Sequence, residues 1–140
     1  MICTLKLARY IYPEFEAHNL QYLRYRLGLE FAEEINPHDA LSDVIVLEKL
    51  FYHFWDKIGE GLEQKTGKPS EREQITEEMI QISGRPSLLH KCIFGKYVGT
   101  LWREVPREYL EWIVYKSSFD DADVLYTARH YLSNNSQLPL

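Results

Sequence analysis

The sequence has 140 residues, of which 45% are apolar and 14% aromatic, and its formal net charge is −5. This composition excludes wholesale disorder, and the length suits one modest domain, or two very small ones, with a real buried core. The negative charge excludes a general electrostatic attraction to nucleic acid, although a local site neutralised by metal ions remains compatible with it.

The two cysteines predict the compartment. Cys3 and Cys92 form no CxxC pair and no even ladder of spacings, which is typical of ordinary thiols in a reducing cytoplasm. The first residues lack the pattern of a signal peptide, and no apolar run approaches the roughly 20 residues that span a membrane. We therefore expect a cytoplasmic chain with no membrane contact.

Three helices are predicted in the first part of the chain. The first lies near Leu5–Ile11, and the second follows Asn19, a favourable N-cap residue, and ends at Gly28. The clearest helical period covers residues 39–58, with a wide apolar stripe that includes Ala40, Val44, Leu47, Phe51, Phe54 and Ile58. Because two short helices cannot cover so wide a stripe, we expect a larger surface to pack there.

The second part of the chain follows a glycine-rich polar stretch. Residues 59–70 predict a linker, and Ser70 with Glu73 predicts a capped helix that runs to about Ile82. The glycines at 95 and 99 indicate a short hairpin, and two further helices are expected after Pro106 and near residues 124–132. The expected chain is mainly α-helical, in two pieces, 1–58 and 71–134.

His38 and Asp43 are the leading candidates for chemistry. His38 precedes the apolar helix and Asp43 lies in its early turns, so both side chains can face one point beyond the helix N-terminus. An aspartate that holds a divalent ion and a histidine that deprotonates water suit phosphodiester hydrolysis. The alternative is a surface loop histidine and a solvated helix aspartate, since this spacing is common by chance.

The residues around this pair resemble a known family. The stretch His38-Asp-Ala-Leu-Ser-Asp43, preceded by a helix that begins His18-Asn-Leu-Gln-Tyr-Leu23, resembles the C-terminal part of the DEDDh-type 3′–5′ exonucleases, which have a ribonuclease H-like α/β fold. The resemblance covers about 55 residues and implies His38 as general base and Asp43 as a metal ligand in a two-metal site for Mg²⁺ or Mn²⁺. The family's D-x-E strand and middle aspartate are not found before His38.

A second resemblance covers about residues 75–132. Phe94-Gly-Lys-Tyr-Val-Gly99 and the later Pro106-Arg-Glu-Tyr-Leu-Glu-Trp112 resemble the C-terminal module of exodeoxyribonuclease X-like proteins. Within it, Lys96 offers a phosphate contact, and Tyr97 or Trp102 offers a ring on which a base could stack. The alternative is that the aromatic residues of this module, namely Phe94, Tyr109 and Trp112, are simply its core.

Three functions follow from these patterns. The first is a split or truncated exonuclease that is inactive alone and complemented by an N-terminal half. The second is a non-catalytic module that binds a protein or a nucleic acid. The third is a self-sufficient nuclease that recruits carboxylates from a second copy. The expected partner is DNA, possibly single-stranded, or RNA.

Overall fold

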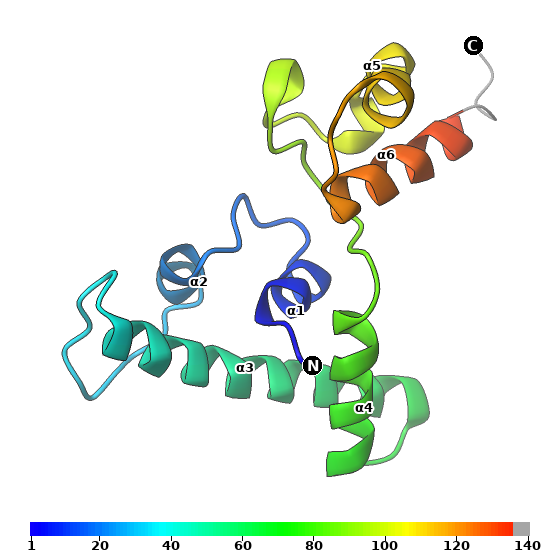
Figure 1. Cartoon of the computed structure of the whole chain (residues 1–140). Coiled ribbons are helices and arrows are strands. Elements are labelled where there is room, and N and C mark those ends of the chain that lie inside the picture. The colour runs from blue at the N-terminus through cyan, green and yellow to red at the C-terminus, as the bar shows by residue number, and fades with distance from the viewer. Residues whose placement is uncertain (136–140) are drawn as a thin grey trace. The chain divides into compact units, whose positions relative to one another are not determined.

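The chain is mainly helical, as the sequence predicts. Figure 1 shows a computed structural model that describes residues 1–135, and these residues form six α-helices and no β-strand. The chain divides into two compact units, with the boundary between Arg85 and Pro86. We refer to these as unit 1 and unit 2 and describe each by itself.

Unit 1 is built around one long helix. Helix α3 (Ala40–Thr66) is in contact with α1 (Thr4–Ile11), α2 (Leu20–Arg26) and α4 (Arg72–Ser83). The predicted cap of α2 is confirmed, because the Asn19 side chain accepts a hydrogen bond from the Tyr22 N–H at 2.9 Å. The core consists of Leu7, Ala8, Phe15, Leu23, Val46, Leu50, Phe54, Ile58, Ile75, Met79 and Ile82.

The expected linker over residues 59–70 is corrected by the structure. Helix α3 continues to Thr66, and the boundary between the units falls after Arg85. Gly59 is buried, and a Cβ atom placed on it would lie 3.1 Å from Ile75 Cδ1. This glycine therefore permits close packing between α3 and α4. It does not belong to a linker.

The start of α4 also differs from the prediction by one residue. Its capping box is formed by Glu71 and Gln74, and the Glu71 N–H donates to Gln74 Oε1 at 2.9 Å. The hydroxyl of Ser70 instead donates to the Gly59 carbonyl at 3.2 Å. Ser70 thereby ties the turn back to α3 rather than capping α4.

Unit 2 combines short helical turns with two helices. Its elements are η1 (Gly95–Tyr97), η2 (Trp102–Glu104), α5 (Arg107–Glu111), the π-helical turn η3 (Trp112–Lys116) and α6 (Ala122–Asn135). A hairpin-like loop pairs Lys91 with Leu101, supported by a 2.8 Å bond from the Cys92 N–H to the Thr100 carbonyl. The core consists of Leu89, Cys92, Trp102, Val105, Leu110, Ile113, Val124, Ala128 and Leu132.

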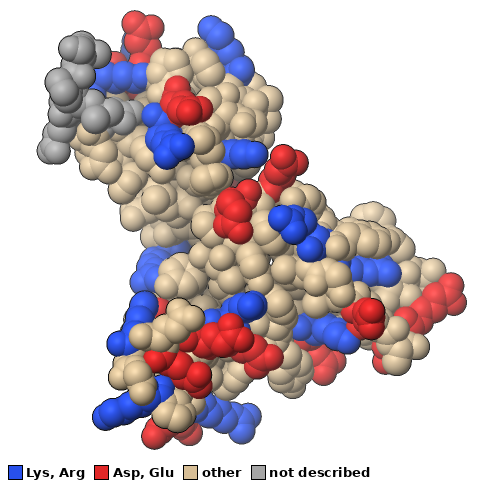
Figure 2. Space-filling model, turned by 180° about the vertical axis from the view of Figure 1, so that it is seen from behind, with Lys and Arg blue, Asp and Glu red and all other residues tan. Residues whose placement is uncertain are grey.

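Charge is distributed unevenly along the chain. In residues 86–140 the basic and acidic residues are equal in number, so the whole negative excess lies in residues 1–85. On the face shown in Figure 2, Lys and Arg side chains are interspersed with Asp and Glu, without a broad basic patch. Within the described part of the chain, no helix has the length and apolar character needed to cross a membrane.

Candidate exonuclease site

A tight turn places His38 in front of α3. The Asp39 N–H donates to the Asn36 carbonyl at 3.1 Å, which closes a β-turn with Pro37 and His38 at its centre. His38 has φ = 68°, and Pro37 suits the position before it, as in a type II turn. Elsewhere among residues 1–135, positive φ occurs at glycines alone. This conformation is uncommon for a non-glycine residue, although histidine adopts it more often than most residues do.

Hydrogen bonds fix this turn to the first turn of α3. The Asp39 side chain is the N-cap and accepts from the Ser42 N–H at 3.1 Å. The Ser42 hydroxyl in turn accepts from the Asn36 N–H at 3.1 Å. Asp39 is thus the N-cap of α3, and Asp43 lies in the first turn of the helix. His38 is exposed and Asp43 is half-buried, and both belong to the N-terminal end of α3.

The described residues contain no complete metal site. No group of three or more His, Cys, Asp and Glu side chains among them is arranged to hold an ion. Asp43 can offer one carboxylate, and a negative charge is also favourable at this end of a helix. A two-metal centre requires several carboxylates around two ions, so the residues present do not fit a complete centre.

One long side of α3 is left uncovered by the described chain. Leu41 is 70% exposed and Val44 58% exposed, although both belong to the most apolar helix of the sequence. We define the α3 outer face as Leu41, Val44, Phe51, Tyr52 and Trp55, of which Phe51 and Trp55 are half-buried. The predicted stripe is therefore divided: Phe54 and Ile58 are buried in the core of unit 1, whereas Val44 and Leu47 are exposed.

Two other histidines belong to the packing of unit 1. His53 Nε2 lies 2.6 Å from the Tyr12 hydroxyl, and His18 Nε2 lies 2.7 Å from the Tyr12 carbonyl oxygen. Burial lowers the pKa of His53, and the Lys57 charge lowers it further. Burial likewise lowers the pKa of His18. The rings of His18 and His53 therefore take part in packing at the edge of the unit 1 core.

In unit 2 the three proposed nucleic-acid contacts separate. Lys96 is exposed and Tyr97 half-buried, both in the turn η1, and the Lys96 ammonium lies 5.5 Å from the centre of the Tyr97 ring. Trp102 has 0% exposure and packs against Phe94 in the core. A base cannot reach a fully buried indole, so the assignment of Trp102 to stacking is corrected to a core role.

The alternative that Phe94, Tyr109 and Trp112 are simply core residues does not hold for Trp112, which lies partly at the surface. The ring of Trp112 is 43% exposed and stacks on Tyr109 with centroids 5.4 Å apart. The adjacent Leu110 and Ile113 are fully buried. The sequence spacing indicates this difference. Residues 109 and 112 share one face of the helix, and residues 110 and 113 share another.

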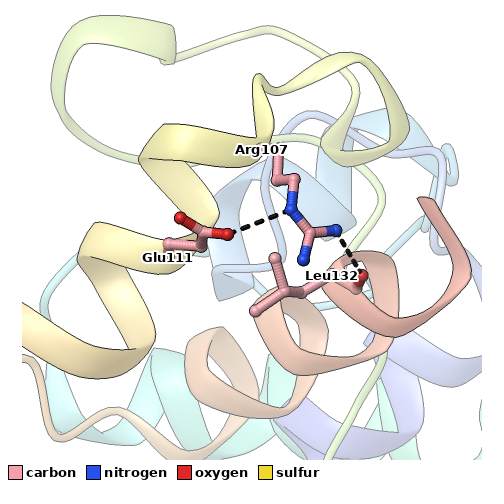
Figure 3. A network of polar contacts seen from close by, with 3 residues as sticks. All are labelled: Arg107, Glu111 and Leu132. Atoms are coloured by element: carbon pink, nitrogen blue, oxygen red, sulfur yellow. Dashed lines mark hydrogen bonds and ion pairs between the residues drawn. The ribbon is translucent and has the colours of Figure 1, made fainter. Parts of the chain in front are cut away.

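Arg107 holds the two helices of unit 2 together. Its Nε donates to Glu111 at 3.0 Å, and its Nη1 donates to the Leu132 carbonyl of α6 at 3.4 Å, as Figure 3 shows. Both charged side chains are about half exposed, so the ion pair itself contributes little to stability. Its structural consequence is that the Glu111 charge, next to Trp112 in the chain, has a basic partner.

Comparison with known proteins finds a similarity to exonucleases. Residues 1–51, which include the His38 turn and the first turns of α3, match the exonuclease family of the RNase T type. Together with a relationship that extends along the whole chain, described next, this match supports a similarity between the chain and a C-terminal part of the DEDDh-type exonucleases. The helical fold is consistent with that part of a ribonuclease H-like exonuclease.

The relatives are exodeoxyribonucleases. The chain is 29% identical over 137 residues to exodeoxyribonuclease 10 of Escherichia coli strain K12 and, equally, to that of Escherichia coli O6:H1 strain CFT073. The matches cover 95% of this chain and 56% of each relative, so the chain spans little more than half of their length. No solved structure matches the chain.

Proposed function

We propose that this chain contributes a general base and one metal-binding carboxylate to a metal-dependent 3′–5′ exonuclease. The observation that carries the proposal is the left-handed backbone conformation of His38. Hydrogen bonds hold this residue in front of α3, within the segment that matches the exonuclease family. His38 accepts the proton of the attacking water, and Asp43 holds a divalent ion, Mg²⁺ or Mn²⁺. The ion supplies charge stabilisation at the phosphodiester.

The remaining carboxylates come from polypeptide other than residues 1–135 in this proposal. The α3 outer face supports it, because apolar side chains as exposed as Leu41 and Val44 mark a surface that another element covers. The favoured occupant is the N-terminal half of an exonuclease domain, which also carries the missing acidic groups. A second copy of this chain is the competing source.

Unit 2 acts in this proposal as a handle for the nucleic-acid substrate. Lys96 is positioned for a phosphate contact, with Tyr97 beside it in the same turn. The charge of residues 86–140 supports this role. Their basic and acidic side chains balance, whereas residues 1–85 have a net negative charge that repels a polyanion. The compartment proposed for this activity is the cytoplasm, where Cys3 and Cys92 remain thiols.

The test measures release of nucleotides from 3′-labelled single-stranded DNA with Mg²⁺ or Mn²⁺. The chain is assayed alone and together with the N-terminal half of exodeoxyribonuclease 10, each beside a His38→Ala variant. We expect cleavage only in the mixture, and only with His38. Cleavage by the chain alone that is lost in His38→Ala would show instead that a second copy completes the site.

A second candidate function is a non-catalytic binding module. The absence of a metal-binding group of side chains among the described residues favours it. Under this alternative, the chain binds nucleic acid without metal, and no complementing polypeptide produces His38-dependent cleavage.

A further inference from the structure

The surface of unit 2 carries a continuous series of aromatic rings. Tyr97 meets Tyr109 edge-on with centroids 4.8 Å apart, and Tyr109 stacks on Trp112 with an angle of 25° between the rings. The series begins in the turn η1 and ends on η3, so two separate segments of the unit build it. Tyr97 and Tyr109 pack against the edge of the core that contains Trp102, and Trp112 is 43% exposed.

The backbone on both sides fixes these rings. A Cβ atom on Gly95 would collide with the Tyr109 hydroxyl, so the η1 turn fits against that ring only because residue 95 is glycine. On the other side, Trp112 opens the π-helical turn, whose Ser117 N–H donates to the Trp112 carbonyl at 2.8 Å. Such turns recur at functional sites. The backbone therefore holds the three rings in place before any ligand binds.

The charges around the series suit an anionic partner. Lys96 lies over the Tyr97 ring, and Lys116 follows Trp112 at the end of the same turn. Two acidic residues adjoin the series in the chain, Glu108 before Tyr109 and Glu111 before Trp112, and Glu111 is paired with Arg107. Aromatic rings beside basic groups are the combination with which proteins bind single strands, because every base has a face that can stack.

We propose that Trp112, supported by Tyr109, stacks on an unpaired base of single-stranded nucleic acid, while Lys96 contacts a neighbouring phosphate. The inference rests on the proposed function and names its substrate class, a single strand rather than a duplex. Bases in a duplex are already stacked and paired, so their faces are not available to Trp112. The pairing with Tyr109 leaves the opposite ring face of Trp112 for the base.

The test measures binding of a fluorescently labelled single strand to the whole chain in EDTA, by anisotropy. Trp112→Leu keeps an apolar side chain but removes the ring, and we expect it to weaken binding roughly 5- to 150-fold. Trp112→Phe should retain most of the affinity. The matched control is Tyr115→Leu, which removes a 74% exposed aromatic outside the ring series and should change nothing.

Two further measurements separate stacking from a folding defect. Single-strand binding should quench tryptophan fluorescence in the wild-type chain, and Trp112→Phe should bind without that quenching. Lys96→Ala should reduce the slope of log affinity against log salt by about 0.7, as expected for one lost phosphate contact on a single strand. Thermal unfolding of every variant is recorded beside the binding curves.

The inference is overturned by any of three results: no binding by the wild-type chain, equal losses in Trp112→Leu and Tyr115→Leu, or equal affinity for duplex and single strand. A change in oligomeric state that is specific to Trp112→Leu also overturns it, because the ring would then contact protein. None of these results depends on hydrolysis. The exonuclease proposal is tested separately, through the dependence of cleavage on His38.

Discussion

The hydroxyl oxygen of Ser42 accepts a hydrogen bond from the backbone N–H of Asn36 at 3.1 Å. Ser42 is buried in the first turn of α3, and Asn36 begins the turn that holds His38. This one contact joins the helix that defines the fold of unit 1 to the loop that carries the candidate base. The position of His38 therefore depends on a side chain that takes no part in the chemistry.

Replacement of Ser42 by alanine should loosen the His38 turn. We expect the free energy of unfolding to fall by about 1 kcal/mol, the typical value of one lost hydrogen bond, as measured by urea denaturation. Cleavage in the complemented assay should fall as well, because the base is no longer held. Ser118→Ala, at an exposed position of unit 2, is the control for the substitution itself. An unchanged stability in Ser42→Ala would contradict this account of the turn.

His38 should prove costly for stability. The left-handed conformation costs a non-glycine residue about 1–2 kcal/mol, and glycine avoids this cost. We therefore expect His38→Gly to be more stable than His38→Ala by about 1 kcal/mol in urea unfolding. Both variants should lose complemented cleavage equally. Equal stability of the two would show that this backbone conformation is not retained.

Gly95 should tolerate alanine less well than Gly99. Both have positive φ, 72° and 84°, so each substitution carries the left-handed cost of about 1–2 kcal/mol. Only at Gly95 does the added Cβ meet the Tyr109 hydroxyl, whereas nothing lies near it at Gly99. Gly95→Ala should thus lower the thermal midpoint further, and Tyr109→Phe in the same chain should restore part of the difference. Identical midpoints for the two alanine variants would refute the steric argument.

Much of the local structure could be predicted from the sequence, because its signals are local. Asn19 and the start of α3 follow from capping preferences. The end of α3 could not be predicted from the sequence. Gly59 is buried because Ile75 packs closely against it, but the sequence does not distinguish such a glycine from one in a flexible linker. Trp102 and Trp112 were likewise indistinguishable, because burial depends on which helix face the rest of the unit covers.

For the candidate site, the sequence predicts residue types and spacing but not local geometry. The residue types and spacing of His38 and Asp43 are visible in the sequence, and the family match includes both positions. The strained conformation of His38 and the bond from Asn36 to Ser42 arise from the geometry of one turn. No residue pattern alone specifies those features.

The stability of unit 1 should fall as the pH drops below neutrality. Burial lowers the pKa of His53, so the folded chain favours the neutral ring that contacts Tyr12. The unfolded chain binds the proton more readily, so this contribution is present above about pH 6.5 and is lost as the pH falls toward the lower folded pKa. The effect of Asp56 and Glu60, which raise the pKa, is smaller than that of burial.

His53→Gln isolates this contribution, because glutamine can accept from the Tyr12 hydroxyl and does not titrate. Urea unfolding followed between about pH 5 and 7.5 should give a shallower pH dependence than the wild type. The remaining slope includes His18, whose pKa burial also lowers. A slope that is unchanged in His53→Gln would exclude this residue as its source.

The α3 outer face should matter for assembly and little for the stability of this chain. Leu41→Lys and Val44→Lys replace exposed side chains, so the free energy of unfolding should change by no more than about 0.5 kcal/mol. Both should weaken association with the complementing exonuclease half, measured by analytical ultracentrifugation. Asp56→Lys, at an exposed position outside this face, is the control for added positive charge, and an equal loss of association there would point to charge rather than to the apolar surface.

Burial along α3 is graded, and this gradient has a dynamic consequence. Val46, Leu50 and Phe54 are fully buried in the middle of the helix, whereas in its first turn only Ser42 is buried, and polar bonds hold the end. Segments with few apolar contacts open locally at lower free energy than the core does. We therefore expect the N-terminal end of α3, next to His38 and Asp43, to exchange its amide hydrogens before the middle of the helix does. A polypeptide that packs on Leu41 and Val44 would also order the neighbouring His38 and Asp43. Binding of the partner and ordering of the proposed catalytic groups would then be one event.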